Sequence, residues 1–217
     1  MTPTLGWDDK IAILNLGDDE NRFSPEFLDT INEQLDEIQS AAQALVTTGG
    51  NKFYTNGLDL DWLGAHADQT QAYVGRVQAL LARVLTFPMP TAAAVTGHAF
   101  GAGAMLAMAH DVRVMRADRG FFCFPEVDIR IPFTDGMAAL IQAKLTPCAA
   151  VASMTTGRRF GGQEAAEFGI VDATAPEGEV AAAETDLLRP LAGKDPGTLG
   201  AIKQTMFRAA ARALTDV

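Results

Sequence analysis

Two glycine-containing loops are the segments of this chain whose residue types and spacing could do chemistry. The first loop is Asn56-Gly57-Leu58-Asp59, and the second is Gly101-Ala102-Gly103, which opens a helix. Small residues at a strand-to-helix junction let the backbone approach a ligand and leave amide N–H groups free to donate. Two such amides, one from each loop, could form an oxyanion hole. The alternative is that both loops are turns whose glycines serve only close packing.

Several other chemistries are excluded by missing motifs. The chain contains no GxxxxGK[ST] phosphate loop, no GxSxG elbow and no HExxH zinc motif. Leu106 stands where a dinucleotide-binding fingerprint beginning at Gly101 would need its third glycine. The three histidines, His66, His98 and His110, are scattered along the chain. They are therefore interpreted as packed or surface residues, and no metal site is predicted.

The composition indicates one globular domain with an acidic surface. Among 217 residues, 48% are hydrophobic, and 17 basic against 27 acidic residues leave a net charge of −10. An acidic chain without basic runs is a poor partner for nucleic acid or for an anionic membrane, so neither is predicted. An anionic small molecule stays compatible with this charge, because a few local cations or a helix N-terminus can hold a phosphate.

Two further features concern the compartment. Cys123 and Cys148 have neither CxxC nor zinc-ligand spacing, so both are predicted to be buried thiols in a reducing environment. The first residues show no signal peptide and the last four no peroxisomal address, which together predict a cytoplasmic protein. The uncharged segment 86–110 contains Pro88, Pro90 and clustered glycines, so it is predicted to be a packed interior segment, not a membrane span.

Strands alternating with helices must position the two loops. Hydrophobic patterning predicts strands at 11–16, 44–47, 91–95, 111–115 and 120–124, and helices that start at Ser24-Pro25, cover 70–85 and run from the second loop to Met108. After residue 129 the pattern predicts helices alone. The expected fold class is therefore α/β, with a helical C-terminal part.

At these loops the sequence resembles the crotonase superfamily of enoyl-CoA hydratases and isomerases. The matching stretches are Phe53–Leu60, Pro90–Ala99, Phe124–Ile129, Thr156–Ala165 and Gly169–Asp172. They occur in order over nearly the whole chain, which makes the resemblance far more specific than either loop. The strings NGLDLDW, VTGHA and EVDI are similar to the monofunctional Δ3,Δ2-enoyl-CoA isomerases of plant peroxisomal type.

The resemblance implies a fold and an assembly. The fold would be the crotonase, or ClpP-like, ββα spiral, with the active site in residues 1–145. Residues 146–217 would be a helix-rich region of the same unit that mediates a homotrimer or a dimer of trimers. The oxyanion hole would consist of the backbone amides of Leu58 and Ala102. The family more often has glycine at the second position, and alanine there is shared by the isomerase subgroup.

Two positions decide how many acids the site holds. The family's hydratases use two glutamates to manage a water molecule, and the matching positions here are Met105 and Glu126. One base beside a pair of amides that stabilise an enolate is sufficient for a 1,3-proton shift. The apolar neighbours of Glu126 are expected to raise its pKa toward neutrality. Asp135 is interpreted as the N-cap of the following helix, with a second acid role as the alternative.

Four residues are predicted to contact the CoA thioester. Arg22 matches the family's adenine-end contacts, although single arginines are usually solvated. Trp62, together with the adjacent Leu63, is predicted to line the acyl tunnel, with simple helix packing as the alternative. Lys203 and Phe207 fall in a region where family members reach a neighbouring subunit's CoA.

The sequence therefore predicts an enzyme of fatty acid metabolism that shifts the double bond of a 3-enoyl-CoA to trans-2-enoyl-CoA. Glu126 would carry the proton, and no metal or redox cofactor is predicted, CoA being part of the substrate. One alternative is another crotonase-type acyl-CoA reaction, namely hydration, decarboxylation or thioester hydrolysis. The other is a non-catalytic acyl-CoA-binding protein of the same fold.

Overall fold

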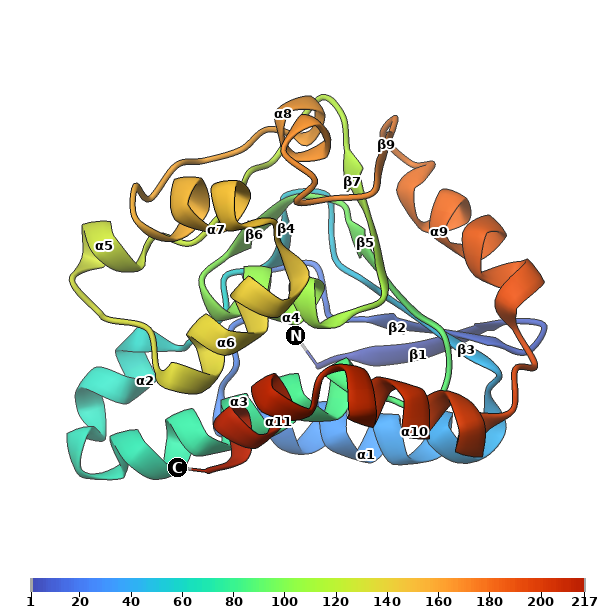
Figure 1. Ribbon diagram of the computed structural model, residues 1–217, viewed down its shortest axis with the longest axis horizontal. Coiled ribbons are helices and arrows are strands. Elements are labelled where there is room, and N and C mark those ends of the chain that lie inside the picture. Colours follow the sequence, from blue (N-terminus) through green and yellow to red (C-terminus); the bar gives the residue numbers. More distant parts are fainter. Residues whose placement is uncertain (1, 217) are drawn as a thin grey trace.

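A six-stranded sheet forms the first layer of the molecule. The computed structural model describes residues 2–216. The strand order is β1-β2-β3-β5-β7-β9, and every neighbouring pair is parallel except β1 with β2 (Figure 1). The strands are β1 (Thr4–Asp8), β2 (Ile11–Asn15), β3 (Ala44–Thr48), β5 (Thr91–Val95), β7 (Val112–Arg116) and β9 (Ala173–Ala175). Strand β5 consists of small residues and is buried along its whole length, as a central parallel strand must be.

A second sheet carries the two loops. It contains β4 (Phe53–Thr55), β6 (His98–Phe100) and β8 (Phe122–Cys123) in the order β4-β6-β8. The chain visits the large sheet, then the small one, then a helix, and does so three times in succession. This repeat is the ββα spiral that the resemblance implied. Each of the two loops follows directly from a strand of the small sheet, so parallel neighbouring strands bring the loops together.

Helices surround both sheets. They are α1 (Pro25–Ala41), α2 (Leu60–Ala65), α3 (Thr70–Leu85), α4 (Ala102–Ala109), α5 (Glu126–Ile129), α6 (Asp135–Lys144), α7 (Pro147–Met154), α8 (Gly162–Glu167), α9 (Val180–Leu188), α10 (Pro196–Met206) and α11 (Arg208–Thr215), with 3-10 turns at Ala67–Gln69 and Arg189–Leu191. Helix α1 begins as predicted, because the Ser24 hydroxyl accepts a hydrogen bond from the Phe27 amide at 3.2 Å.

Helix α4 lies in the centre of the core, and all eight of its residues are buried. It belongs to the uncharged segment 86–110, whose interior position was predicted. None of the described helices combines the length and apolar character that a bilayer crossing requires. The C-terminal helix α11 packs against α6 and α3, next to the spiral (Figure 1). A division of the chain at residue 145 stays a prediction.

Two sequence-based expectations are wrong. The C-terminal part is not helical throughout, because β9 pairs with β7 and adds a sixth strand to the sheet. Three residues, Ala-Thr-Ala, carry too little pattern to reveal a strand. Cys123 is buried as expected, and its Sγ donates to the Gly157 carbonyl at 3.3 Å, whereas Cys148 is exposed on α7.

Helix α9 covers the outer face of the large sheet and brings a buried carboxyl group with it. It contacts β3, β5 and β7 (Figure 1). Glu184 is fully buried there among apolar side chains. Its Oε1 accepts a hydrogen bond from the Val114 amide, and its Oε2 has no partner among residues 2–216. Burial raises the pKa of Glu184 to about 8, so the folded protein holds this group protonated near neutral pH.

Folding stability is therefore expected to fall as the pH rises from about 4.5 to about 8. Over this range the unfolded chain ionises at position 184 while the folded chain keeps the proton. Glu184→Gln keeps an acceptor for the Val114 amide and removes the titration. Between pH 5 and pH 8.5 we expect the parent to lose on the order of 2–4 kcal/mol more free energy of unfolding than the variant loses.

Urea unfolding at the two pH values measures this difference. Glu37→Gln is the matched control, since Glu37 is an exposed glutamate on α1. Equal pH dependence in Glu184→Gln and in the parent protein would show that Glu184 does not titrate on folding.

Candidate active site

A cavity of about 330 Å³ lies where the two loops meet α5. Its wall is mostly apolar, and both predicted loops contribute to it. The lining side chains and backbone atoms come from Arg22, Asn56, Leu58, Leu60, Asp61, Phe100, Gly101, Ala102, Met105, Pro125, Glu126, Ile129, Ile131, Pro132 and Met137. The structure thus brings together Leu58, two residues of α4, Ala102 and Met105, and Glu126, which come from three separate parts of the sequence.

Gly57 sets the distance between the two loops. Its φ is +75°, and a Cβ atom there would lie 2.6 Å from the Gly103 nitrogen and 2.8 Å from the Ala102 nitrogen. Only glycine allows so close an approach in this conformation. The close-packing interpretation of this glycine is therefore correct, and the same packing brings the two loops together; the oxyanion hole stays a prediction.

The backbone N–H groups of Leu58 and Ala102 donate no hydrogen bond within residues 2–216. The amides of Gly57, Asp59 and Gly101 do donate. Gly101 donates to the Cys123 carbonyl at 3.0 Å, and Asp59 donates to the Tyr73 hydroxyl at 2.8 Å. Ala102 is the first residue of α4, so the positive end of the helix dipole adds to its amide.

Glu126 supplies a buried carboxyl group in the cavity wall. It is the first residue of α5 and is 8% exposed. Its Oε1 lies 3.4 Å from the point where a Cβ on Gly101 would stand, and its Oε2 has no hydrogen-bond partner among the described residues. Burial raises the pKa of Glu126 to about 7, as the apolar neighbours predicted. A carboxyl group of this pKa both accepts and returns a proton readily at neutral pH.

Met105 also lines the cavity and is buried to 1% exposure. Two more charged residues, Arg22 and Asp61, line the cavity at its rim and pair with each other at 2.5 Å. Glu126 is therefore the one ionisable group at the cavity's interior, among the residues that the structure describes.

Asp135 is not the N-cap and does not line this cavity. Thr134 is the cap, since its hydroxyl accepts from the Met137 amide at 3.2 Å, and Asp135 is the first residue of α6. Asp135 is exposed and lines a different cavity, beside Thr70. The capping prediction was wrong by one residue, and the structure offers no support for Asp135 as a second acid.

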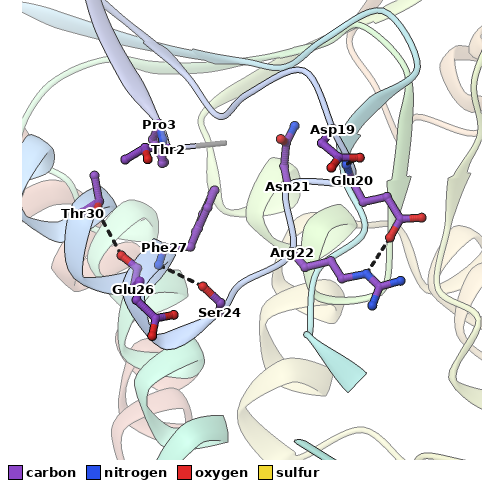
Figure 2. Close-up of a pocket in the computed structure, with 10 residues that line it drawn as sticks. All are labelled: Thr2, Pro3, Asp19, Glu20, Asn21, Arg22, Ser24, Glu26, Phe27 and Thr30. Carbon is purple, nitrogen blue, oxygen red and sulfur yellow. Dashed lines mark hydrogen bonds and ion pairs between the residues drawn. The ribbon is translucent and has the colours of Figure 1, made fainter. Parts of the chain in front are cut away.

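Arg22 lies at the rim of the cavity. Its guanidinium contacts Glu20 Oε2 at 2.6 Å and Asp61 Oδ2 at 2.5 Å. Figure 2 shows it beside a second cavity at the start of α1, which is lined by the carboxylates of Asp19, Glu20 and Glu26. Binding of CoA by Arg22 stays a prediction.

Trp62 does not line the cavity. Its ring stacks on His66 with 4.3 Å between centroids and lies 4.9 Å from the Tyr73 ring. The helix-packing alternative is therefore correct, and Leu60 and Asp61 of the same helix line the cavity instead. A six-residue helix gives no periodicity from which its inner face could be read.

Lys203 and Phe207 lie away from this cavity, and their contact with a neighbouring subunit's CoA stays a prediction. The Lys203 ammonium is buried, donates to the Met89 carbonyl at 2.7 Å and pairs with Asp111 at 2.5 Å. Phe207 is 7% exposed, with the Lys144 ammonium 5.1 Å from its ring centre. Sequence reasoning instead missed lining residues such as Phe100, Ile129, Ile131 and Met137; the first two lie in or beside the loop strings that carry the resemblance.

Comparison with known proteins identifies the family. Residues 8–217 match the family model described as enoyl-CoA hydratase/isomerase. The chain belongs to the enoyl-CoA hydratase/isomerase family. It is 38% identical over 190 residues to enoyl-CoA delta isomerase 2, peroxisomal, of Arabidopsis thaliana, covering 82% of this chain and 79% of the relative. It is 37% identical to enoyl-CoA delta isomerase 3 of the same plant, covering 73% and 70%.

Solved structures of the enoyl-CoA hydratase/isomerase family share the fold. A Mycobacterium tuberculosis protein described as a probable enoyl-CoA hydratase superposes with a TM-score of 0.91 at 26% identity, covering 98% of this chain and 91% of the other. A second structure of that mycobacterial protein, described as an enoyl-CoA isomerase, gives 0.90 at 25% identity, covering 98% and 93%. Fold similarity therefore does not distinguish hydration from isomerisation. The side chains that line the cavity are needed to distinguish them.

Proposed function

We propose that this protein is a Δ3,Δ2-enoyl-CoA isomerase. The observation that carries the proposal is a single buried carboxyl group, Glu126, in a cavity that also holds two amides without a partner among residues 2–216 and has Met105 in its wall. The relatives named enoyl-CoA delta isomerases support the same reaction.

The reaction moves one proton between two carbons of the acyl chain. The thioester oxygen accepts hydrogen bonds from the Leu58 and Ala102 amides, which stabilise the negative charge of the enolate. Ionised Glu126 removes a proton from C2, and the electrons of the broken C–H bond delocalise over the thioester and the C3–C4 double bond. Protonated Glu126 then returns the proton to C4, which leaves the double bond between C2 and C3. A pKa of about 7 balances the two transfers.

CoA enters this scheme as part of the substrate. Arg22 is the cation at the rim of the cavity and is proposed to contact the CoA phosphates. No metal or redox group takes part in the proposed steps.

The test is turnover of 3-hexenoyl-CoA, followed as the absorbance of the conjugated thioester product. A steady rise in absorbance supports the isomerase. Binding of the substrate without any turnover would identify the chain as a non-catalytic acyl-CoA-binding protein, and release of free thiol would identify a thioesterase.

A methyl group placed between the two loops is expected to lower the activity of the enzyme strongly. In Gly57→Ala the added methyl group meets the Ala102 and Gly103 nitrogens, so the two amides must move apart. We expect kcat/KM to fall by about two to three powers of ten, the range for loss of an oxyanion-hole donor. Gly64→Ala is the control, since Gly64 lies on α2 with nothing within 4 Å of the new methyl group. Parent-like kcat/KM in a folded Gly57→Ala variant would remove the two amides from the mechanism.

The assembly is proposed to be a homotrimer or a dimer of trimers built on the C-terminal helices. Ile202 and Met206 on α10 are 55% and 72% exposed in the single chain, and a cyclic assembly would cover such residues. Light scattering of the active protein tests this, and a monomer mass would contradict it. We also propose a cytoplasmic location.

A further inference from the structure

Glu126 lies between two cavities. Besides the active-site cavity, it lines a second one of about 490 Å³, here named the tail cavity. Ile131 and Pro132 also line both cavities. The two cavities are therefore adjacent at the residue that is proposed to move the proton. In the proposed reaction C2 and C4 lie next to Glu126, so the carbons beyond C4 are at the boundary of the tail cavity.

Apart from Glu126, apolar residues and one cation line the tail cavity. Its remaining walls come from Val127, Phe133 and Met154, and Arg130 is the one basic residue among those that line it. Arg130 is exposed and makes no ion pair with any other residue between 2 and 216. An apolar wall suits methylene groups, and a guanidinium without a protein partner suits a carboxylate.

The backbone at Arg130 is unusual for its residue type. Its φ is +60°, in the left-handed region, where its amide closes α5 by donating to the Glu126 carbonyl. Glycine adopts this conformation without cost, whereas other residues lose about 1–2 kcal/mol. The arginine side chain is thus held one turn beyond Glu126 at a position where a glycine would serve the backbone better.

We propose that the tail cavity binds the distal part of the acyl chain and that Arg130 selects chains whose far end carries a carboxylate. The substrate class is then the CoA monothioesters of unsaturated dicarboxylic acids. This inference rests on the proposed isomerase function. A methyl-ended chain fills the same apolar space but leaves the guanidinium without its anion.

The experiment compares substrate pairs of equal length. One member is a methyl-ended 3-enoyl-CoA, beginning with 3-hexenoyl-CoA, and the other carries a carboxyl group at the far carbon. We expect kcat/KM to favour the carboxyl-ended member by about tenfold at the length that reaches Arg130, the range for one charge-assisted hydrogen-bonded pair. In Arg130→Gln this ratio falls by about tenfold, and in Arg130→Lys it recovers in part. Arg130→Gly, which suits the left-handed backbone, loses the preference without strain.

Arg119→Gln is the matched control, because Arg119 is an exposed arginine outside both cavities, and it should keep the ratio of the parent. Turnover of methyl-ended substrates without any preference for the carboxyl end would overturn the inference and leave the isomerase standing. Absence of turnover on every 3-enoyl-CoA would overturn the isomerase itself. If kcat/KM of Arg130→Gln fell equally on both members of a pair and its mass in light scattering changed, Arg130 would belong to a subunit contact. That result would also overturn the inference.

Discussion

Glu126→Gln is expected to lower isomerase turnover by about two to four powers of ten, the usual contribution of a positioned general base. Glutamine keeps the shape of the side chain and cannot carry the proton. Glu126 is 8% exposed in an apolar wall, and within residues 2–216 no second carboxyl group lies inside the cavity to replace it. Binding of acyl-CoA should persist, because the Leu58 and Ala102 amides are untouched.

The parent enzyme should show the same group in its pH profile. The step at C2 needs ionised Glu126, whose pKa burial raises to about 7. We therefore expect kcat/KM to rise with pH through about 7 and to level off above it, whereas an ordinary glutamate would be fully ionised well below that pH.

Asp135→Asn is the matched control for both measurements. Asp135 lies at the start of α6 and lines a different cavity, so its loss should change neither the rate nor the pH profile. Most of the turnover surviving in Glu126→Gln would show that another group carries the proton.

The parts of the fold that were predictable have strong local patterns. Helix α3 covers Thr70–Leu85 as predicted, because its apolar residues recur at helical spacing along one side. The start of α1 was visible in the Ser24-Pro25 pair. Strands β4 and β6 are absent from the predicted strands, since three residues each are too few to show alternation.

The candidate site was predictable where its residues fall in or directly after the family strings. Leu58 and Glu126 fall inside those strings, Ala102 follows shortly after VTGHA, and all three line one cavity. Lys203 lies outside the strings, and its environment depends on Asp111, which lies 92 positions earlier in the chain and pairs with it in the interior. No local pattern reveals such a partner, because α10 reaches it only through tertiary packing.

Other properties of the site depend on three-dimensional contacts. The sequence shows a glycine at position 57, but only the structure shows the Ala102 nitrogen lying 2.8 Å from where its side chain would begin. Likewise, the position of Glu126 between two cavities follows from the turn of the chain after α5. Segments distant in sequence form these contacts, so residue spacing cannot encode them.

Met105 gives the second large prediction, which concerns water. A hydratase of this family has a second glutamate at the matching position, and here a buried thioether lines the cavity instead. A thioether accepts hydrogen bonds weakly and cannot exchange a proton. Hydration needs one group to activate the water and another to protonate the α-carbon, and Glu126 alone cannot do both at once.

Hydration of crotonyl-CoA is therefore expected to be slower than isomerisation of 3-hexenoyl-CoA by about two to four powers of ten, or roughly 3–5 kcal/mol in the barrier. Both rates should be measured side by side on the unmodified protein. Met105→Glu restores the second acid and should raise the hydration rate, while Met105→Gln controls for placing a polar group in a buried wall. Because similar structures carry the names of both hydratases and isomerases, the ratio of the two rates decides the assignment. Hydration as fast as isomerisation would show that Glu126 has an acid partner, and the single-base mechanism would then be wrong.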